Sequence, residues 1–190
     1  ASVRLWDLTD LLQVSLNDVY LAHRDAVWSV AFSANGHTLA SAGADKQIIL
    51  WDTEADTEFS RLFAVSPGPV YGLSLNAAGD VLATAGAARV GTAARISLWD
   101  FPAGTLRESL EDSSGLITSV VFNPATQTLL SASFDSTVRF WQPGNTTPLG
   151  EITIPGFSVL HAIVVSPDGK RLAAATDQAE ITVWDLESSA

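Results

Sequence analysis

Three side-chain types that hydrolases combine for nucleophilic catalysis occur near the start of this 190-residue chain, at His23, Ser41 and Asp45. In a catalytic triad a histidine takes the proton of a serine hydroxyl, and a carboxylate orients the imidazole. That chemistry requires an exposed serine oxygen beside donors for an oxyanion. Whether it applies here depends on the elements that position the three residues.

A second candidate site is the segment GAARVGT at residues 86–92, whose glycines have the spacing of a phosphate-binding loop. The lysine that must follow the second glycine is absent, and we expect no helix here to receive a phosphate. The histidines at 23, 37 and 161 do not have metal-ligand spacing. We therefore predict no cofactor and no metal site.

Tryptophan recurs along the whole chain and divides it into units of similar length. Trp-Asp pairs begin at Trp6, Trp51, Trp99 and Trp184, and a Trp-Gln variant begins at Trp141. The intervals of 45, 48, 42 and 43 residues are typical of a solenoid or propeller repeat. Each tryptophan ends a short run of alternating apolar residues, which predicts a strand with one buried face.

Further strand candidates surround these tryptophans, separated by turns rich in Gly, Pro and Asn. The expected first strands are Val27–Phe32, Val70–Leu75, Ile117–Phe122 and Leu160–Val165. The expected fourth strands lie around Leu11–Leu16, Phe59–Phe63, Leu106–Leu110 and Leu149–Ile154. Because no segment keeps a helical period over three turns, we predict an all-β chain of four-stranded antiparallel meanders.

The segment LAHRDAVWSVAFSANGHTLASAGADKQIILWD, residues 21–52, resembles a WD40 repeat, and the other full units resemble it more loosely. The resemblance implies an all-β, WD40-type β-propeller segment of four-stranded antiparallel blades. It divides a single repeat domain, 1–190, into the end of one unit at 1–20, repeats at 21–63, 64–110 and 111–154, and a repeat at 155–190 that lacks its outer strand. We expect three complete blades plus partial blades at both ends.

In the WD40 family a His, a Ser or Thr, an Asp and the repeat Trp form a buried hydrogen-bonded chain within one blade. The resemblance assigns this structural tetrad to His23, Ser41, Asp45 and Trp51. Such a chain commits the serine hydroxyl to an indole inside a sheet, where every polar group is satisfied. We therefore favour a structural role over a catalytic triad and predict a protein that is not an enzyme.

The other units lack one or more members of the tetrad. The residues at the corresponding positions are Ser66, Thr84 and Trp99 in the third unit, Ser113, Ser131, Asp135 and Trp141 in the fourth, and Gly156, Ala174, Asp177 and Trp184 in the fifth. We expect these blades to depend more on apolar packing, and the unit around His23 to be the most rigid.

Charge and composition limit the partners. A net charge of -11 without a cluster of Lys or Arg repels phosphate backbones, so we expect no nucleic acid partner. No apolar run approaches the roughly 18 residues of a membrane span, and no signal peptide is recognisable. We expect a protein partner, no membrane association and a cytoplasmic location.

Candidate partner-binding residues come from one aligned position in the expected first strands. That position, directly after the first apolar residue, holds Trp28, Tyr71, Thr118 and His161. Aromatic residues at a partly exposed rim anchor interfaces, although packing against neighbouring blades explains them equally well. Arg89 and Arg95, in a longer loop, are further candidates for contact with an acidic partner, or belong to a solvated insertion.

The function that this pattern favours is a non-catalytic protein-interaction scaffold or sensor module. A closed ring of seven or eight blades needs roughly 300 residues, so we expect a fragment of a larger WD40-repeat protein. The Ala-rich style of SPDGKRLAAATD, residues 166–177, resembles bacterial members of the family, which suggests signalling. Two alternatives stay open: a half-propeller that completes its ring as a homo-oligomer through open blade edges, and an enzyme or ligand-binding propeller that uses the central channel.

Overall fold

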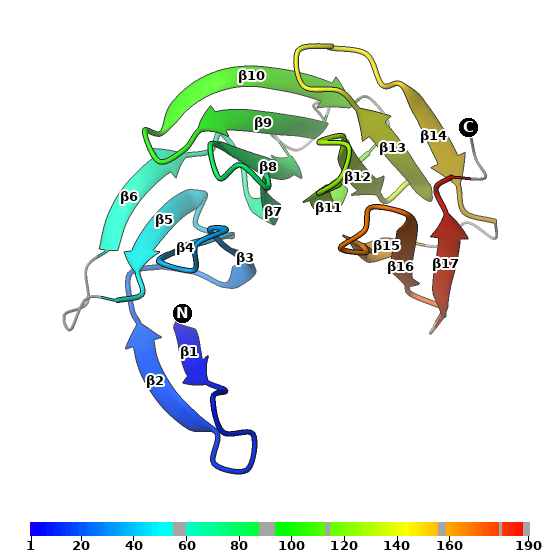
Figure 1. The fold of residues 1–190 in the computed structure, drawn as a ribbon. Coiled ribbons are helices and arrows are strands. Elements are labelled where there is room, and N and C mark those ends of the chain that lie inside the picture. Colours follow the sequence, from blue (N-terminus) through cyan, green and yellow to red (C-terminus); the bar gives the residue numbers. More distant parts are fainter. Residues whose placement is uncertain (55–59, 88–93, 113–114, 156–158, 179, 188–190) are drawn as a thin grey trace.

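The computed structural model describes the chain except for residues 55–59, 88–93, 113–114, 156–158, 179 and 188–190. The described residues form seventeen strands and contain no helix, hence none long and apolar enough to cross a membrane. The strands make five antiparallel sheets in which sequence neighbours pair. Figure 1 shows the sheets side by side along an open arc, with the first strand of each larger sheet on the concave side.

The first sheet has two strands, β1 (Val3–Asp7) and β2 (Ser15–Tyr20). The three complete sheets are made of β3 (Val27–Phe32), β4 (Thr38–Gly43), β5 (Gln47–Asp52) and β6 (Ser60–Val65); β7 (Val70–Leu75), β8 (Val81–Ala87), β9 (Ala94–Asp100) and β10 (Thr105–Asp112); and β11 (Ile117–Phe122), β12 (Leu129–Ser133), β13 (Thr137–Trp141) and β14 (Gly150–Thr153). The last sheet has β15 (Leu160–Val165), β16 (Arg171–Thr176) and β17 (Ile181–Asp185). The expected propeller segment, with three complete blades and a partial blade at each end, is confirmed.

The outer strand of the first sheet does not lie where the sequence predicted it. The expected strand at Leu11–Leu16 begins only at Ser15 and continues to Tyr20. The Asp10 carboxylate accepts a hydrogen bond from the backbone N–H of Leu12, and the Asp10 carbonyl accepts one from Gln13. These bonds hold the apolar stretch in a turn, where the Leu12 side chain is exposed.

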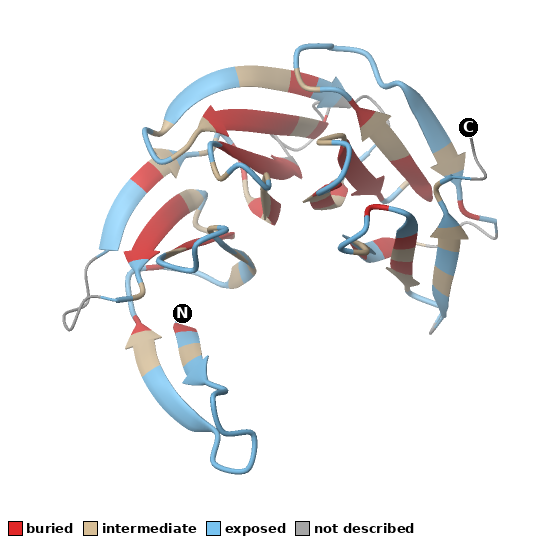
Figure 2. Cartoon of the chain, in the orientation of Figure 1, coloured by how far each residue is buried: buried red, intermediate tan, exposed pale blue. Residues whose placement is uncertain are grey.

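The hydrophobic core is divided among the interfaces between neighbouring sheets. The described residues form four clusters of buried apolar side chains, and each cluster joins residues of two adjacent sheets. The buried residues are therefore concentrated on the middle strands of the complete sheets (Figure 2). A sheet that stacks on two neighbours is buried on both faces, which is why β4 and β8 read as small apolar runs instead of alternating.

Serine hydroxyls connect the innermost strands of adjacent sheets. Each accepts a hydrogen bond from a backbone N–H of the next sheet: Ser29 from Leu73 at 3.0 Å, Ser74 from Phe122 at 3.0 Å, and Ser119 from Ile163 at 3.3 Å. Gly72 of β7 permits a close approach to β11 of the next sheet. A Cβ atom on Gly72 would lie 3.0 Å from both Ser119 Cα and Val120 N.

Replacing Gly72 by alanine is therefore expected to force β7 away from β11. Overpacking of this kind costs about 1–3 kcal/mol, and we expect a loss of that size in the free energy of unfolding, measured with urea. Gly150→Ala is the matched control, because Gly150 also lies in a strand and a Cβ there meets no atom within 4 Å. Equal stability of the two variants would contradict the close approach of β7 and β11.

Candidate functional site

The segment before β3, the strands β4 and β5 and the turn between those two strands bring the four predicted tetrad residues together. Nδ1 of His23 lies 2.9 Å from Oδ2 of Asp45, and Nε2 lies 2.7 Å from Oγ of Ser41. The indole N–H of Trp51 donates to the same Ser41 oxygen at 2.7 Å. His23, Ser41 and Trp51 are buried residues. Asp45 is partly exposed as a whole residue, but its side chain is only 5% exposed.

The hydrogen-bond donors and acceptors of this network balance. The Asp45 carboxylate accepts the Nδ1 proton of His23, which leaves Nε2 to accept the Ser41 hydroxyl proton. A free lone pair of the Ser41 oxygen then accepts the indole N–H. Because Ser41 is 0% exposed, its oxygen cannot reach a substrate, and the arrangement holds strands together instead of forming a nucleophile.

The Asp45 carboxylate also receives backbone donors. The N–H groups of Arg24 and Gln47 bond to it at 2.9 and 3.1 Å. Burial alone raises the pKa of the Asp45 carboxyl, but these two donors and the His23 imidazole outweigh that effect and hold the pKa below its ordinary value of 3.8. The ionised carboxylate is therefore the form that the fold stabilises.

The bond between the repeat indole and a second-strand hydroxyl recurs without the histidine. Trp99 donates to Oγ1 of Thr84, and Trp141 donates to Oγ of Ser131, both at 2.9 Å. Asp135 of the fourth unit accepts instead from Thr137 and Arg139. Ser113, the residue predicted at the histidine position there, lies outside the described residues.

The tetrad is least complete in the last unit. Ala174 provides no hydroxyl for Trp184, which is only half-buried, and Gly156 lies outside the described residues. Asp177 still accepts a backbone N–H, from Val159 at 3.0 Å. The last sheet therefore keeps the turn contact of the motif without its buried polar chain.

The five repeat tryptophans differ in how far they are buried. Trp51, Trp99 and Trp141 are buried, whereas Trp6 is 48% exposed. The sheet of Trp6 has only β1 and β2, so it lacks the second strand that supplies the hydroxyl in the complete sheets. The Trp-Asp sequence alone does not report burial.

Two of the rim candidates form an aromatic pair. The rings of Trp28 on β3 and Tyr71 on β7 stack with centroids 4.4 Å apart and planes 9° from parallel. Trp28 remains 45% exposed. The pair thus joins two neighbouring sheets and also presents aromatic surface to solvent.

The other partner-binding candidates have different surroundings. The Thr118 hydroxyl donates to the carbonyl of Leu160 at 2.7 Å, so it connects two sheets. His161 is exposed. Arg95 forms an ion pair with Glu111 at 2.8 Å, and Arg89 lies outside the described residues.

A cleft that the sequence did not indicate lies between the last complete sheet and the last sheet. Its volume is about 630 Å³, and its apolar lining consists of Ala125, Leu130, Phe140, Leu149, Ile152 and Leu186. The turn residues Asn123 and Gly169 meet at this cleft, where the Asn123 side chain donates to the Gly169 carbonyl at 2.8 Å. These segments are far apart in the sequence and come together only when the sheets stack. Among the described residues, no cluster of His, Cys, Asp or Glu could hold a metal ion.

Comparison with known proteins supports the repeat assignment. The family model described as "WD domain, G-beta repeat" matches residues 15–52 and 104–142. Periodic tryptophan protein 2 of Arabidopsis thaliana is 29% identical over 87% of this chain and 18% of its own length. Pre-mRNA-processing factor 17 of Homo sapiens is 26% identical over 89% of this chain and 28% of its own length. Transducin beta-like protein 3 of Bos taurus is 25% identical over 100% of this chain and 24% of its own length. The chain therefore spans less than a third of the length of each of these three relatives.

Replacing His23 by alanine is expected to lower the free energy of unfolding by about 1–3 kcal/mol, because the Ser41 and Asp45 side chains would lose a buried partner. Chemical denaturation measures the loss. His37→Ala is the matched control, since His37 is exposed and its imidazole pairs with Glu54 on the surface. A His23→Ala protein as stable as the control would show that the buried network does not stabilise the fold.

The lowered pKa of Asp45 predicts a dependence of stability on pH. A carboxyl whose pKa is lower in the folded state contributes stability above its unfolded value, here 3.8, and loses it as pH falls through the folded value. We expect the difference in unfolding free energy between the wild-type chain and Asp45→Asn to be constant near neutral pH and to shrink below about pH 4. A difference that grew in acid would refute this.

Proposed function

Because the chain belongs to the WD40-repeat β-propeller family, we propose that it is a non-catalytic scaffold that binds protein partners within a larger WD40-repeat protein. The limited share of each relative that it matches supports the second part of this proposal. The burial of the Ser41 hydroxyl supports the non-catalytic part, since the His, Ser and Asp that resembled a catalytic triad in the sequence bond to one another and to Trp51 inside the sheet.

The observation that carries the proposal is the exposed aromatic pair of Trp28 and Tyr71. A hydrogen bond from the Leu73 backbone N–H to the Ser29 hydroxyl already connects β7 to β3. The contact between these two sheets therefore does not depend on the aromatic pair alone. Large aromatic rings held rigidly at a partly exposed position are typical anchors of protein interfaces. The pair lies on β3 and β7, the innermost strands of two neighbouring sheets, at the concave side of the arc (Figure 1).

Charge favours a basic partner. With a net charge of -11, the chain attracts a positively charged surface and accelerates its approach at low salt. The ion pair between Arg95 and Glu111 leaves that arginine poorly suited to the acidic partner considered from the sequence. The cytoplasmic location and the signalling role stay predictions, because the relatives' names point to other subjects, such as pre-mRNA processing.

The binding surface can be tested by recovering proteins from an extract of the source cells on the immobilised chain. We expect Trp28→Ala combined with Tyr71→Ala to reduce the recovered partner at least tenfold, since an interface anchor is worth about 2 kcal/mol or more. Leu106→Ala, at an exposed apolar residue on the outer strand β10, is the matched control. Equal recovery by a folded double variant and by the control would refute this surface.

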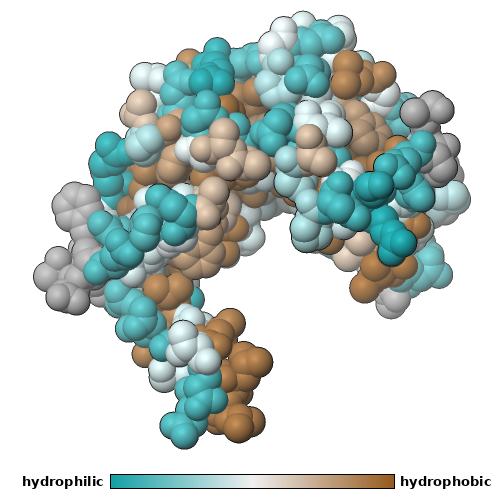
Figure 3. Space-filling view, in the orientation of Figure 1, coloured by the Kyte–Doolittle hydropathy of each residue, from teal (hydrophilic) through white to brown (hydrophobic). Residues whose placement is uncertain are grey.

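Self-association is a second candidate, favoured by exposed apolar side chains toward both ends of the arc. They are Val30 and Phe32 on β3, and Val164, Ile181 and Val183 on β15 and β17; apolar surface is visible at both ends in Figure 3. In sedimentation velocity this candidate predicts a dimer that Ile181→Asp with Val183→Asp dissociates. A monomer at every concentration would contradict it and would leave the scaffold proposal intact.

A further inference from the structure

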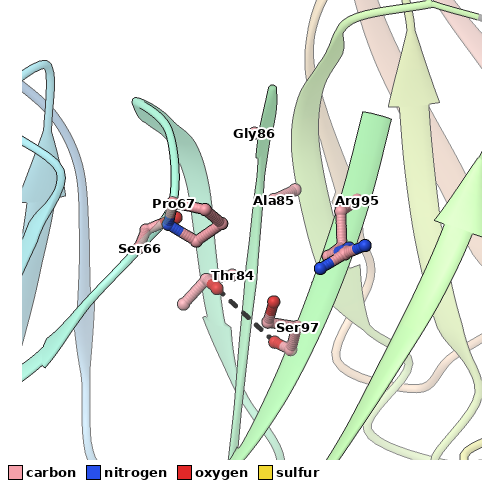
Figure 4. Close-up of a pocket in the computed structure, with 7 residues that line it drawn as sticks. All are labelled: Ser66, Pro67, Thr84, Ala85, Gly86, Arg95 and Ser97. Carbon is pink, nitrogen blue, oxygen red and sulfur yellow. Dashed lines mark hydrogen bonds between the residues drawn. The ribbon is translucent and has the colours of Figure 1, made fainter. Parts of the chain in front are cut away.

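A small hollow in the sheet β7–β10 corresponds to the place that the His23 imidazole occupies in the sheet β3–β6. It is lined by Ser66, Pro67, Thr84, Ala85, Gly86, Arg95 and Ser97 (Figure 4). Its volume is about 10 Å³, which is roughly what the centre of one water molecule requires. A metal complex, a phosphate or an organic ligand does not fit.

The hydroxyl at this cavity has spare bonding capacity. Oγ1 of Thr84 accepts the indole N–H of Trp99 at 2.9 Å, just as Ser41 accepts that of Trp51. Ser41 is also bonded to the His23 imidazole at 2.7 Å, whereas the second contact of Thr84 is to the carbonyl of Ser97 at 3.5 Å. A contact of that length is at the limit of a hydrogen bond.

An unpaired donor faces the same space. Arg95 stands on β9 at the position that Gln47 has on β5, next to the carboxylate of the complete network. Its terminal nitrogen bonds to Glu111, but its Nε is buried and has no hydrogen-bond partner among the residues that the structure describes. A buried donor of a charged group that lacks a partner is destabilising, so a partner for this atom is expected.

We propose that one ordered water molecule occupies this cavity and bridges Arg95 Nε and Thr84 Oγ1. The water accepts the Nε–H and donates one proton to the remaining lone pair of the threonine oxygen, and its other proton is directed to the polar lining formed by Ser66 and Ser97. Buried waters typically make about three such bonds. The third unit thus keeps its repeat tryptophan in a satisfied polar chain, with water and arginine in place of histidine and aspartate.

A crystal structure that resolves ordered solvent tests this directly. We expect a water peak within hydrogen-bond distance of both Arg95 Nε and Thr84 Oγ1. In Arg95→Met the peak should disappear, and in Arg107→Met it should persist. Arg107 is the matched control because its Nε is already bonded to Asp100, also in the sheet β7–β10.

The wild-type chain alone provides an independent readout in solution. A long-lived internal water gives nuclear Overhauser effects to the Thr84 methyl and the Trp99 indole proton, and we expect both. An empty cavity, a direct bond from Arg95 Nε to a protein oxygen, or the absence of these effects would overturn the proposal. A water that remains in Arg95→Met would overturn the role assigned to the arginine.

Discussion

The fold depends on one buried hydrogen bond, from the indole N–H of a repeat tryptophan on a third strand to a hydroxyl on the second strand. It occurs in each of the three complete sheets, at Trp51, Trp99 and Trp141. A buried indole without an acceptor would lose the bond it makes to water, so the second and third strands must keep their register. That register in turn decides which side chains face the adjacent sheets.

This constraint places the polar groups of the complete network inside the sheet, where they hold strands together. The serine, histidine and aspartate of the complete network satisfy one another, and the serine oxygen has no exposure left for catalysis. Residues outside the network provide the surface that a partner can contact. Trp28 and Tyr71 lie on first strands whose positions are set by these stacked sheets, so the exposed aromatic surface is presented with little conformational freedom.

The repeat period, the strands and the blade order could be predicted because tryptophan spacing and apolar alternation are local signals. The predicted strand at Leu11–Leu16 was misplaced because the Asp10 side chain organises a turn that hydrophobicity does not reveal. The exposure of Trp6 and the cleft near Phe140 could not be predicted either. Both depend on which strands and turns meet across sheets, and the spacing of residues along the chain does not contain that information.

Hydrogen exchange at the indole N–H groups, followed by nuclear magnetic resonance, measures the central interaction most directly. The structure predicts strong protection for Trp51, Trp99 and Trp141, whose protons are bonded inside the sheets, and fast exchange for the exposed Trp6. Exchange of the three buried indoles at the rate of Trp6 would show that their bonds to the second-strand hydroxyls do not hold the blades together.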